Sequence, residues 1–549
     1  MSQNNDFFEK NMTALKLVDP NLFNSINSET NLSCYDRSIC AKTGELVPSF
    51  SDGKAMYSVY NPQREAENFF PPHQPNETMR FVTVLGLGNG KAIELELQKK
   101  QSRILAIETN AASIKQLFFD FDFSILLQNE NFCLCTAQTV CEKLCSFYLP
   151  QLHGNFLQLQ NRVWVQHNQQ VTEKINADIK SALKKISADY SVQAHFGKIW
   201  QRNIFENLQI LSEAKNYAAF DLKNKKYASI IAAGPSLDKS IKNLCKNRGE
   251  NFIIATDTAS LILLRHKITP DVVLTIDGQN ISYRHFVEKC QENSTVFIND
   301  LCALPAVAKK CVQDKNQVVF TQNSHPFLQI VNEYFEQKKL PLLNFVQTNS
   351  GTVTNAAVDF ALQCGFEKII LYGADFAYSM GKPYAKASYL DDTFYNNSTR
   401  LNNGETAFTA LMFRTELTEK VQNVYTSEVL QSYEDSLKNY LGNLDFSVKV
   451  YKAKEEKIEI FFDNSAKFLQ TRRQINCKKT FETVQLDFNF ADFKVWFSAR
   501  LKNADILHDT ALQRALLPFA AWCQHKNLYK SGQDSFLVVL ELAKKQLLK

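Results

Sequence analysis

Between residues 228 and 371, short apolar segments rich in β-branched residues alternate with amphipathic stretches. Segments that are apolar throughout are typical of strands buried on both faces, so this alternation predicts a parallel sheet covered by helices on both sides. The predicted strands are residues 228–233, 252–256, 272–276, 296–298, 318–321, 343–347 and 369–371. In such sheets ligands bind beyond the carboxyl ends of the strands, and functional residues are expected there.

The first of these strands runs into a turn formed by Gly234, Pro235 and Ser236, and a helix is predicted directly behind it. Gly234 lets the backbone approach a ligand closely, Pro235 stiffens the turn, and the Ser236 hydroxyl is placed to cap the helix. Free N–H groups and the helix dipole favour an anion at such a position, so the turn is a predicted phosphate site.

A second turn repeats this arrangement. Asn349, Ser350, Gly351 and Thr352 follow a predicted strand and open a helix with one apolar face, which Gly365 ends. Two helix ends suited to phosphate in one sheet indicate a nucleotide site.

Polar residues also follow the other predicted strands. Asp257 and Thr258, Asp277 and Gln279, and Gly373 and Asp375 each come directly after an apolar run. A single Asp at a strand end is most often a helix cap, but repetition at strand after strand predicts a nucleotide pocket, since ribose, base and phosphate need such donors and acceptors.

The N-terminal segment contains a glycine loop of its own. Residues 81–85 read as a strand, Gly86, Gly88 and Gly90 follow, and a second strand at 103–108 ends in Glu108. Rossmann-like domains hold a nucleotide or S-adenosylmethionine in this way. A tight turn in a domain that has lost its ligand fits the same pattern, and both interpretations stay open.

A chain of 549 residues is long enough for several domains. The patterns predict a multidomain α/β protein: a Rossmann-like domain at 1–160, a helical connector at 161–222, a central parallel-sheet domain at 223–396 and a mostly helical region at 397–549.

Composition excludes several classes of protein. The formal net charge of +5 is too small for its length to indicate nucleic-acid binding, no apolar run is long enough to span a membrane, and the polar N-terminus lacks the layout of a signal peptide. The 13 cysteines include a group at positions 133, 135, 141 and 145 whose spacing misses the zinc pattern. We therefore expect a cytoplasmic protein with free thiols.

In their order along the chain, Ala232 to Leu237, Asp257 to Ala259, the segment from Asp271 to Gln279, Asn349 to Gly351 and Gly373 to Tyr378 resemble the central domain of the motility-associated factor (Maf) family. Members of that family are flagellin glycosyltransferases with a core similar to bacterial sialyltransferases. The archaeal-type hydroxymethylpterin pyrophosphokinases share the core.

The resemblance implies an inverting transfer of a nonulosonic acid, of the pseudaminic or legionaminic type, from a CMP-sugar to Ser or Thr of flagellin. By this analogy the turns at 234–236 and 350–352 flank CMP. Asp257 faces the nucleotide, Asp277 and Gln279 line the pocket, and Tyr378 binds phosphate. No tightly bound cofactor is implied, and a divalent metal is possible but not required. The flanking regions are expected to recognise the protein acceptor.

The identity of the general base stays open. Sialyltransferases of this type use a late histidine, but this chain has none between His325 and His508, and Tyr384 stands where Maf-like sequences often carry one. The candidates are Asp375, His325 and Tyr384. Two other functions remain: a pterin pyrophosphokinase that uses ATP and magnesium, with Asp257, Asp277 and Asp375 as metal ligands, and a non-catalytic flagellin-binding chaperone.

Overall fold

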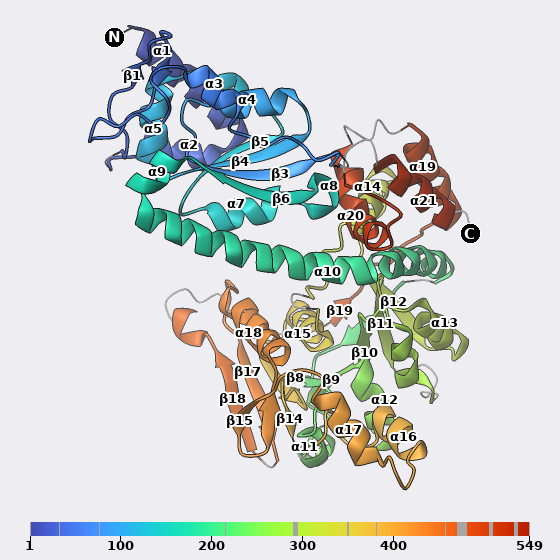
Figure 1. The fold of residues 1–549 in the computed structure, drawn as a ribbon. Coiled ribbons are helices and arrows are strands. Elements are labelled where there is room, and N and C mark those ends of the chain that lie inside the picture. Colours follow the sequence, from blue (N-terminus) through green and yellow to red (C-terminus); the bar gives the residue numbers. More distant parts are fainter. Residues whose placement is uncertain are drawn as a thin grey trace. The chain divides into compact units, whose positions relative to one another are not determined.

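The computed structural model describes residues 2–31, 33–75, 77–214, 216–246, 248–288, 295–348, 351–379, 381–455, 457–468, 480–503, 509–531 and 536–547. The chain forms two compact units (Figure 1). The N-terminal unit comprises Met1–Gly197 and Leu517–Lys545, and the central unit comprises Lys198–Leu516 and Gln546–Lys549. The sequence pattern had divided the chain into four segments.

The N-terminal unit contains a four-stranded parallel sheet with the strand order β5-β4-β3-β6. Its strands are β3 (Arg80–Leu85), β4 (Ser102–Glu108), β5 (Phe132–Thr136) and β6 (Asn155–Gln160). Among the elements around this sheet are α1 (Ser2–Val18), α2 (Pro20–Asn27), α3 (Pro62–Glu67), α4 (Lys91–Gln98), α5 (Ala111–Asp120), α6 (Ser124–Leu127), α7 (Val140–Phe147) and α8 (Pro150–His153). The strands predicted at 81–85 and 103–108 are confirmed.

The predicted connector is helical. It consists of α9 (Arg162–His167) and α10 (Gln169–Glu213), a single helix of 45 residues. The sequence explains its length, because the first glycine within it is Gly197 and it contains no proline. The division between the two units falls inside this helix, at Gly197.

The central unit is built on an eight-stranded sheet with the order β12-β11-β10-β9-β8-β13-β17-β18, shown in Figure 1. Its strands are β8 (Tyr227–Ile231), β9 (Asn251–Thr256), β10 (Val272–Thr275), β11 (Val296–Asp300), β12 (Gln317–Thr321), β13 (Lys368–Tyr372), β17 (Lys449–Lys454) and β18 (Lys457–Asp463). All neighbours are parallel except β17 and β18. Six of the seven predicted strands are confirmed; residues 343–347 form only an isolated bridge between Phe345 and Gln322.

Helices cover both faces of this sheet. Helices α15 (Val353–Gln363) and α18 (Glu428–Gly442) share one apolar core with strand residues such as Ile230 and Leu371. Helices α11 (Leu237–Lys246), α12 (Asp257–Arg265) and α13 (Pro305–Gln313) pack against β13, β9 and β12. Side chains of alternate strand positions, Ile231 and Ile253 among them, are buried too, as expected for a sheet with two covered faces.

The prediction of a separate, mostly helical region at 397–549 is wrong in part. Strands β17 and β18 extend the central sheet, and β15 (Thr418–Val421) with β16 (Val424–Thr426) forms a hairpin that pairs with β14 (Tyr378–Ser379). The free edge of β13 supplies a pairing partner from far back in the chain, which local sequence patterns do not show. Helices α17 (Gly404–Met412), α19 (Phe490–Asn503), α20 (Thr510–His525) and α21 (Phe536–Leu547) also belong to this region, and α16 (Tyr389–Asn396) comes directly before it.

The structure bears on two features noted in the composition, within the part of the chain that it describes. Helices both long and apolar enough to cross a membrane are absent from it. The cysteines at 133, 135, 141 and 145 are free thiols, and Cys135 is fully buried.

The strand order places a topological switch point between β8 and β13. From β8 the chain adds β9, β10, β11 and β12 in one direction, and β13 then returns to the other side of β8. Ligand crevices of doubly wound sheets form at such points, beyond the carboxyl ends of the two strands. The turns after β8 and β13 therefore define the candidate site.

Candidate functional site

The turns that follow β8 and β13 are bonded directly to each other. The Gly234 N–H donates to the Gly373 carbonyl at 2.8 Å, and the Ser236 N–H donates to Asp375 Oδ2 at 2.8 Å. The Ser236 hydroxyl donates to the other oxygen of Asp375. A Cβ on Gly234 would lie 2.4 Å from the Gly373 carbonyl oxygen. Glycine at 234 is thus required for the close approach of the two turns.

This bonding fills the first predicted phosphate site. The Asp375 carboxylate stands at the N-terminus of α11, where an anion is favoured. The next N–H groups, of Leu237 and Asp238, donate to the carbonyls of Gly234 and Pro235 at 3.0 and 3.3 Å. Asp375 therefore holds the turn in place with both carboxylate oxygens, a positioning role rather than that of a free base.

The second predicted turn lies partly outside the described residues, which omit Asn349 and Ser350. Gly351 adopts φ +80°, and its N–H donates to the Thr348 carbonyl at 2.8 Å. Thr352 caps α15, because its hydroxyl accepts the Asn355 N–H at 3.2 Å. The helix predicted behind this turn is present, with the expected start.

Asp257 is fully buried at the end of β9 and begins α12. Its Oδ1 accepts the Thr258 N–H at 2.7 Å, and its Oδ2 accepts the Thr275 hydroxyl at 2.8 Å. Burial raises the pKa of this carboxyl, and the nearby His285 opposes that shift. Asp257 thus joins the ends of β9 and β10, and it is the first residue of α12, whose N-cap position, Thr256, makes no side-chain capping bond.

Asp277 and Gln279 lie in the loop after β10. Asp277 accepts the Gln279 N–H at 3.0 Å and the Ser282 hydroxyl at 2.7 Å, and Gln279 is exposed. These bonds hold the start of a short 3-10 helix, η1 (Asn280–Phe286). The loop therefore presents a partly exposed carboxylate next to the end of β9.

η1 also supplies a histidine that the sequence analysis missed. His285 is buried, and its ring packs edge-on against Tyr389 with 4.7 Å between the ring centroids. Its Nδ1 is buried without a hydrogen-bond partner. Burial lowers the pKa of His285, and Asp257 and Asp277 act in the opposite direction. The only hint in the sequence was its place in the loop that begins at Asp277.

Tyrosines complete this cluster. The rings of Tyr384 and Tyr389 lie 6.4 Å apart, and Tyr378 on β14 pairs in register with Tyr425 on β16. Burial raises the pKa of Tyr384 and of Tyr378. Both phenols are therefore protonated at neutral pH, so they are hydrogen-bond donors to an anion and poor bases.

His325 belongs to a different set of contacts. Its Nδ1 accepts the Phe327 N–H at 3.2 Å, and its ring packs edge-on against Trp200 at 5.4 Å. Burial lowers the pKa of His325 to about 4, which makes it a weak base at neutral pH. These contacts are those of a loop histidine ordered by its neighbours.

Asp257, Asp277 and Asp375 do not assemble into a metal site. Within the described ranges there is no group of three or more His, Cys, Asp or Glu side chains placed to hold a metal ion. Each of the three carboxylates is bonded to hydroxyl or N–H groups of its own neighbourhood.

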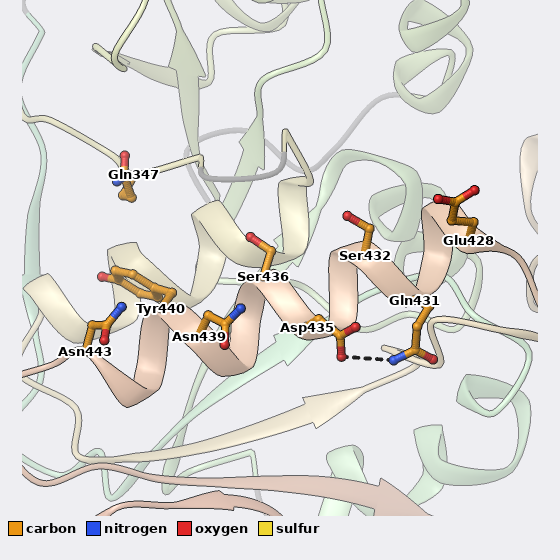
Figure 2. A pocket seen from close by; sticks show the side chains of 9 residues that line it. All are labelled: Gln347, Glu428, Gln431, Ser432, Asp435, Ser436, Asn439, Tyr440 and Asn443. Atoms are coloured by element: carbon orange, nitrogen blue, oxygen red, sulfur yellow. Dashed lines mark hydrogen bonds between the residues drawn. The ribbon is translucent and has the colours of Figure 1, made fainter. Parts of the chain in front are cut away.

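A groove of about 780 Å³ lies elsewhere in the central unit, along α18 (Figure 2). It contains none of the predicted site residues. Each residue that lines it carries an amide, a hydroxyl or a carboxylate: Gln347, Glu428, Gln431, Ser432, Asp435, Ser436, Asn439, Tyr440 and Asn443. Because Glu428 and Asp435 give it negative charge, the groove does not suit an anionic donor.

The glycine loop of the N-terminal unit is filled by the chain itself. A Cβ on Gly86 would lie 2.8 Å from the Trp164 ring, and one on Gly88 would lie 2.2 Å from the Tyr57 hydroxyl. Aromatic side chains thus rest directly on the loop that holds a phosphate in Rossmann domains.

Glu108, the acidic residue at the end of β4, is also engaged. It is fully buried and accepts the Leu87 N–H at 2.6 Å, the Tyr35 hydroxyl at 2.8 Å and the Trp164 indole N–H at 3.2 Å. Burial raises the pKa of Glu108. Three hydrogen-bond donors of the protein itself thus engage this carboxylate.

Comparison with known proteins agrees with this architecture. A solved structure of the MAf glycosyltransferase from Magnetospirillum magneticum AMB-1 superposes with a TM-score of 0.53 over 99% of this chain and 90% of that one, at 16% identity. The chain has the Maf fold. The predicted fold class, an α/β multidomain protein of this type, is thereby confirmed. Residues 200–381, which carry most of the Maf-like core, also match the family model described as 6-hydroxymethylpterin diphosphokinase MptE-like.

Uncharacterized proteins of Treponema pallidum (strain Nichols) match parts of the chain. One is 34% identical over 153 residues, which are 28% of this chain and 72% of that protein, and this chain belongs to its family. A second is 36% identical over 140 residues, 25% of this chain and 48% of that protein. A third is 24% identical over 226 residues, 41% of this chain and 46% of that protein. The chain thus spans about half the length of the last two.

Proposed function

We propose that this protein is a glycosyltransferase that transfers a nonulosonic acid, of the pseudaminic or legionaminic type, from a CMP-sugar to Ser or Thr of flagellin. The observation that carries the proposal is the polar cluster at the carboxyl ends of β9, β10 and β13, in a chain that has the Maf fold along nearly its whole length. Its partners would be the nucleotide sugar and flagellin.

The chemistry requires a base and a means to stabilise the leaving group. As the acceptor oxygen attacks the anomeric carbon, its proton must leave, and the bond from that carbon to the CMP phosphate breaks. Among the groups of the cluster, His285 fits the base best. Its ring stays neutral at neutral pH because burial lowers its pKa, and Asp257 and Asp277 stabilise the imidazolium that forms.

A pterin pyrophosphokinase is the second candidate, supported by the family match over residues 200–381. That activity transfers a diphosphate from ATP with magnesium, and carboxylates usually hold the metal. The separation of Asp257, Asp277 and Asp375 into individual hydrogen-bonded groups favours the glycosyltransferase.

The test is reconstitution with purified components. The protein is incubated with unmodified flagellin and a CMP-nonulosonic acid, and intact mass spectrometry of flagellin follows. We expect a mass gain of whole sugar residues. The His285→Gln protein should give less than about a hundredth of the rate, since a general base typically contributes 10²–10⁴-fold.

The outcomes separate the candidates. No mass gain with any CMP-sugar, together with diphosphate transfer from ATP to hydroxymethylpterin, would establish the kinase instead. Unchanged transfer by His285→Gln would leave the glycosyltransferase standing and remove His285 as the base. Its far-ultraviolet spectrum should match that of the wild type, so that a loss of activity is not a loss of folding.

A further inference from the structure

Two asparagines on α10 bond to the loops that follow β10 and β11. Asn203 and Asn207 lie four residues apart, in the part of α10 that belongs to the central unit, so they share one face of the helix. Both side chains are fully buried. Asparagine is a poor helix former and is costly to bury, so two of them in successive turns indicate a specific role for their amides.

The amide of Asn203 is fully engaged. Its Nδ2 donates to the Gly278 carbonyl at 3.1 Å and to the Cys302 carbonyl at 3.0 Å. Its Oδ1 accepts Nη2 of Arg202 at 2.8 Å, which fixes the amide with its nitrogen toward the two carbonyls. Asn203 therefore joins the loop after β10 to the turn after β11.

Asn207 makes the same kind of contact with the turn after β11 alone. Its Nδ2 donates to the Leu301 carbonyl at 2.9 Å and to the Ala303 carbonyl at 2.8 Å. The two asparagines are thus alike in helix, in burial and in the number of carbonyls that they bond. They differ in that Asn203 also reaches the loop after β10.

Gly278 fits closely against this anchor. A Cβ on Gly278 would lie 2.9 Å from the Cys302 carbonyl oxygen and 3.0 Å from Asn203 Nδ2. The preceding carbonyl, that of Asp277, accepts the N–H of Leu304, the N-cap residue of α13, at 3.0 Å. Two successive carbonyls of the loop are therefore bonded, one by α10 and one by the start of α13.

The anchored carbonyls lie at the start of the segment that carries part of the candidate site. Asp277 accepts the Ser282 hydroxyl of η1, and the carbonyl of His285, also on η1, accepts the hydroxyl of Ser260 on α12 at 3.3 Å. Because Gly278 leads directly into η1, a shift of its backbone would displace both Asp277 and His285. A misplacement of about 1 Å can cost an enzyme roughly a hundredfold in rate.

We propose that Asn203 is a positioning residue of the candidate site, which holds the loop after β10 through Gly278 and thereby sets the placement of Asp277 and His285. The inference rests on the proposed function, because it assigns this loop to the transfer reaction. Asn203 acts through the loop and not by contact with the substrate.

The experiment compares Asn203→Ala with Asn207→Ala in the full-length protein. Each variant removes a buried amide that donates to two carbonyls, so both should lower the urea midpoint, and to a similar extent. Transfer from a CMP-nonulosonic acid to flagellin, followed by intact mass spectrometry, gives kcat and KM. We expect kcat of Asn203→Ala to fall at least about tenfold, with the KM for the donor changed less than about threefold. The kcat of Asn207→Ala should stay within about twofold of the wild type.

The paired variants separate positioning from stability. A general loss of stability affects both alike, so equal losses of kcat in the two variants, or wild-type kcat in Asn203→Ala, would overturn the positioning role. Gly278→Ala covers the case in which Asn203→Ala does not fold. Its added Cβ displaces the same loop from the other side of the hydrogen bond and should lower kcat at least about tenfold. Wild-type kcat in Gly278→Ala would then overturn the inference.

Failure of the proposed function gives a different result. A wild-type protein that transfers no sugar argues against the glycosyltransferase and leaves no kcat to compare. Hydrogen–deuterium exchange of the peptide that spans residues 277–286 then tests the placement of the loop alone. Faster exchange there in Asn203→Ala but not in Asn207→Ala supports the role of Asn203, and equal exchange in the two variants overturns it.

Discussion

Gly234 and Gly373 bring the turns after β8 and β13 so close that a single added carbon meets backbone. A Cβ on Gly373, which has φ +63°, would lie 2.3 Å from the Ala232 carbonyl oxygen, as tight as the contact at Gly234. The Ser236–Asp375 bonds depend on this approach. At the scale of single residues, the geometry of the site therefore depends on the absence of a Cβ atom at both glycines.

The first prediction follows from that contact. Gly234→Ala should lower the free energy of unfolding by about 1–3 kcal/mol, the usual cost of overpacking, and should weaken binding of a CMP-sugar. Gly442→Ala is the matched control, because no atom lies within 4 Å of its added Cβ. Urea unfolding and calorimetry measure the two effects, and equal behaviour of both variants would contradict the role given to Gly234.

Asp300, at the end of β11, leads to a second prediction. Burial raises the pKa of this carboxyl to about 7, and its Oδ2 is buried without a hydrogen-bond partner. Because the folded pKa lies above the ordinary value, the folded state holds the proton more tightly. Its stabilising contribution is complete below the ordinary pKa of about 4, and it is lost as the pH rises from there through about 7.

Asp300→Asn should therefore remove that pH dependence. The amide oxygen can still accept the Cys302 N–H and the Asn323 amide, which donate to Asp300 Oδ1 at 2.7 and 3.0 Å. We expect near-equal stability of variant and wild type at about pH 3, below the ordinary pKa of an aspartate, and a more stable variant, by roughly 2–4 kcal/mol, at about pH 8.5. Parallel urea curves at both pH values are the measurement. A difference that does not grow with pH would show that Asp300 is ionised in the folded protein at neutral pH.

At the scale of elements, β17 changes how acceptor recognition can be tested. Ending the chain near Asn396 looks, from the sequence alone, like a clean removal of a flanking region. In the structure it would strip β17 from β13 and take away α18, whose Leu437 and Leu441 are fully buried in the core of the sheet. Such a truncation would expose an unpaired strand edge, which promotes aggregation.

Point changes on α18 are the sharper test. The groove there offers amides and hydroxyls, which bind a polypeptide backbone by donating and accepting hydrogen bonds. We predict that Asn439→Arg weakens capture of flagellin in a pull-down while the affinity for a CMP-sugar stays unchanged. Lys438→Ala, on the same helix but outside the groove, is the control. Undiminished capture by Asn439→Arg would move the acceptor site away from α18.

Patterns in the sequence predicted the elements that local periodicity determines. The strands from β8 to β13 were found because each is apolar throughout, and α15 because Gly365 follows its apolar face. The pairing of β17 with β13 was not found, since it joins segments some eighty residues apart. For the same reason the pattern placed Asp375 at a strand end but not against Ser236. It also gave no weight to His285, which gains significance only from its contact with Tyr389 on α16.

At the scale of the whole molecule, fold and sequence diverge to different extents. The Maf fold extends over 99% of the chain at 16% identity, while the match of 34% identity to a Treponema pallidum protein covers 28% of it. The core of a doubly wound sheet requires only apolar side chains of suitable volume. Such conditions preserve a fold long after most residues have changed, so chemistry must be argued from the site.

The N-terminal unit is an example of a fold that does not by itself establish a binding function. It has the strand order, the glycine loop and the acidic residue of a nucleotide-binding domain, yet Tyr57 and Trp164 rest on the loop and Glu108 is fully bonded. We predict that neither NAD nor S-adenosylmethionine at millimolar concentration shifts its thermal unfolding. Tyr57→Phe, which removes only the hydroxyl beside Gly88, should leave that result unchanged. A rise in the midpoint of the wild-type protein would show that the aromatic side chains move aside.

A domain that is stabilised by a bound metabolite becomes less stable when the concentration of that metabolite falls. Saturation at a hundredfold excess over Kd contributes about 2.7 kcal/mol, and the contribution vanishes when the metabolite is depleted. Here the occupant of the loop is part of the covalent chain, present in every molecule as soon as it is synthesised. If neither compound shifts the unfolding midpoint, the folded fraction of the N-terminal unit does not depend on the supply of either metabolite.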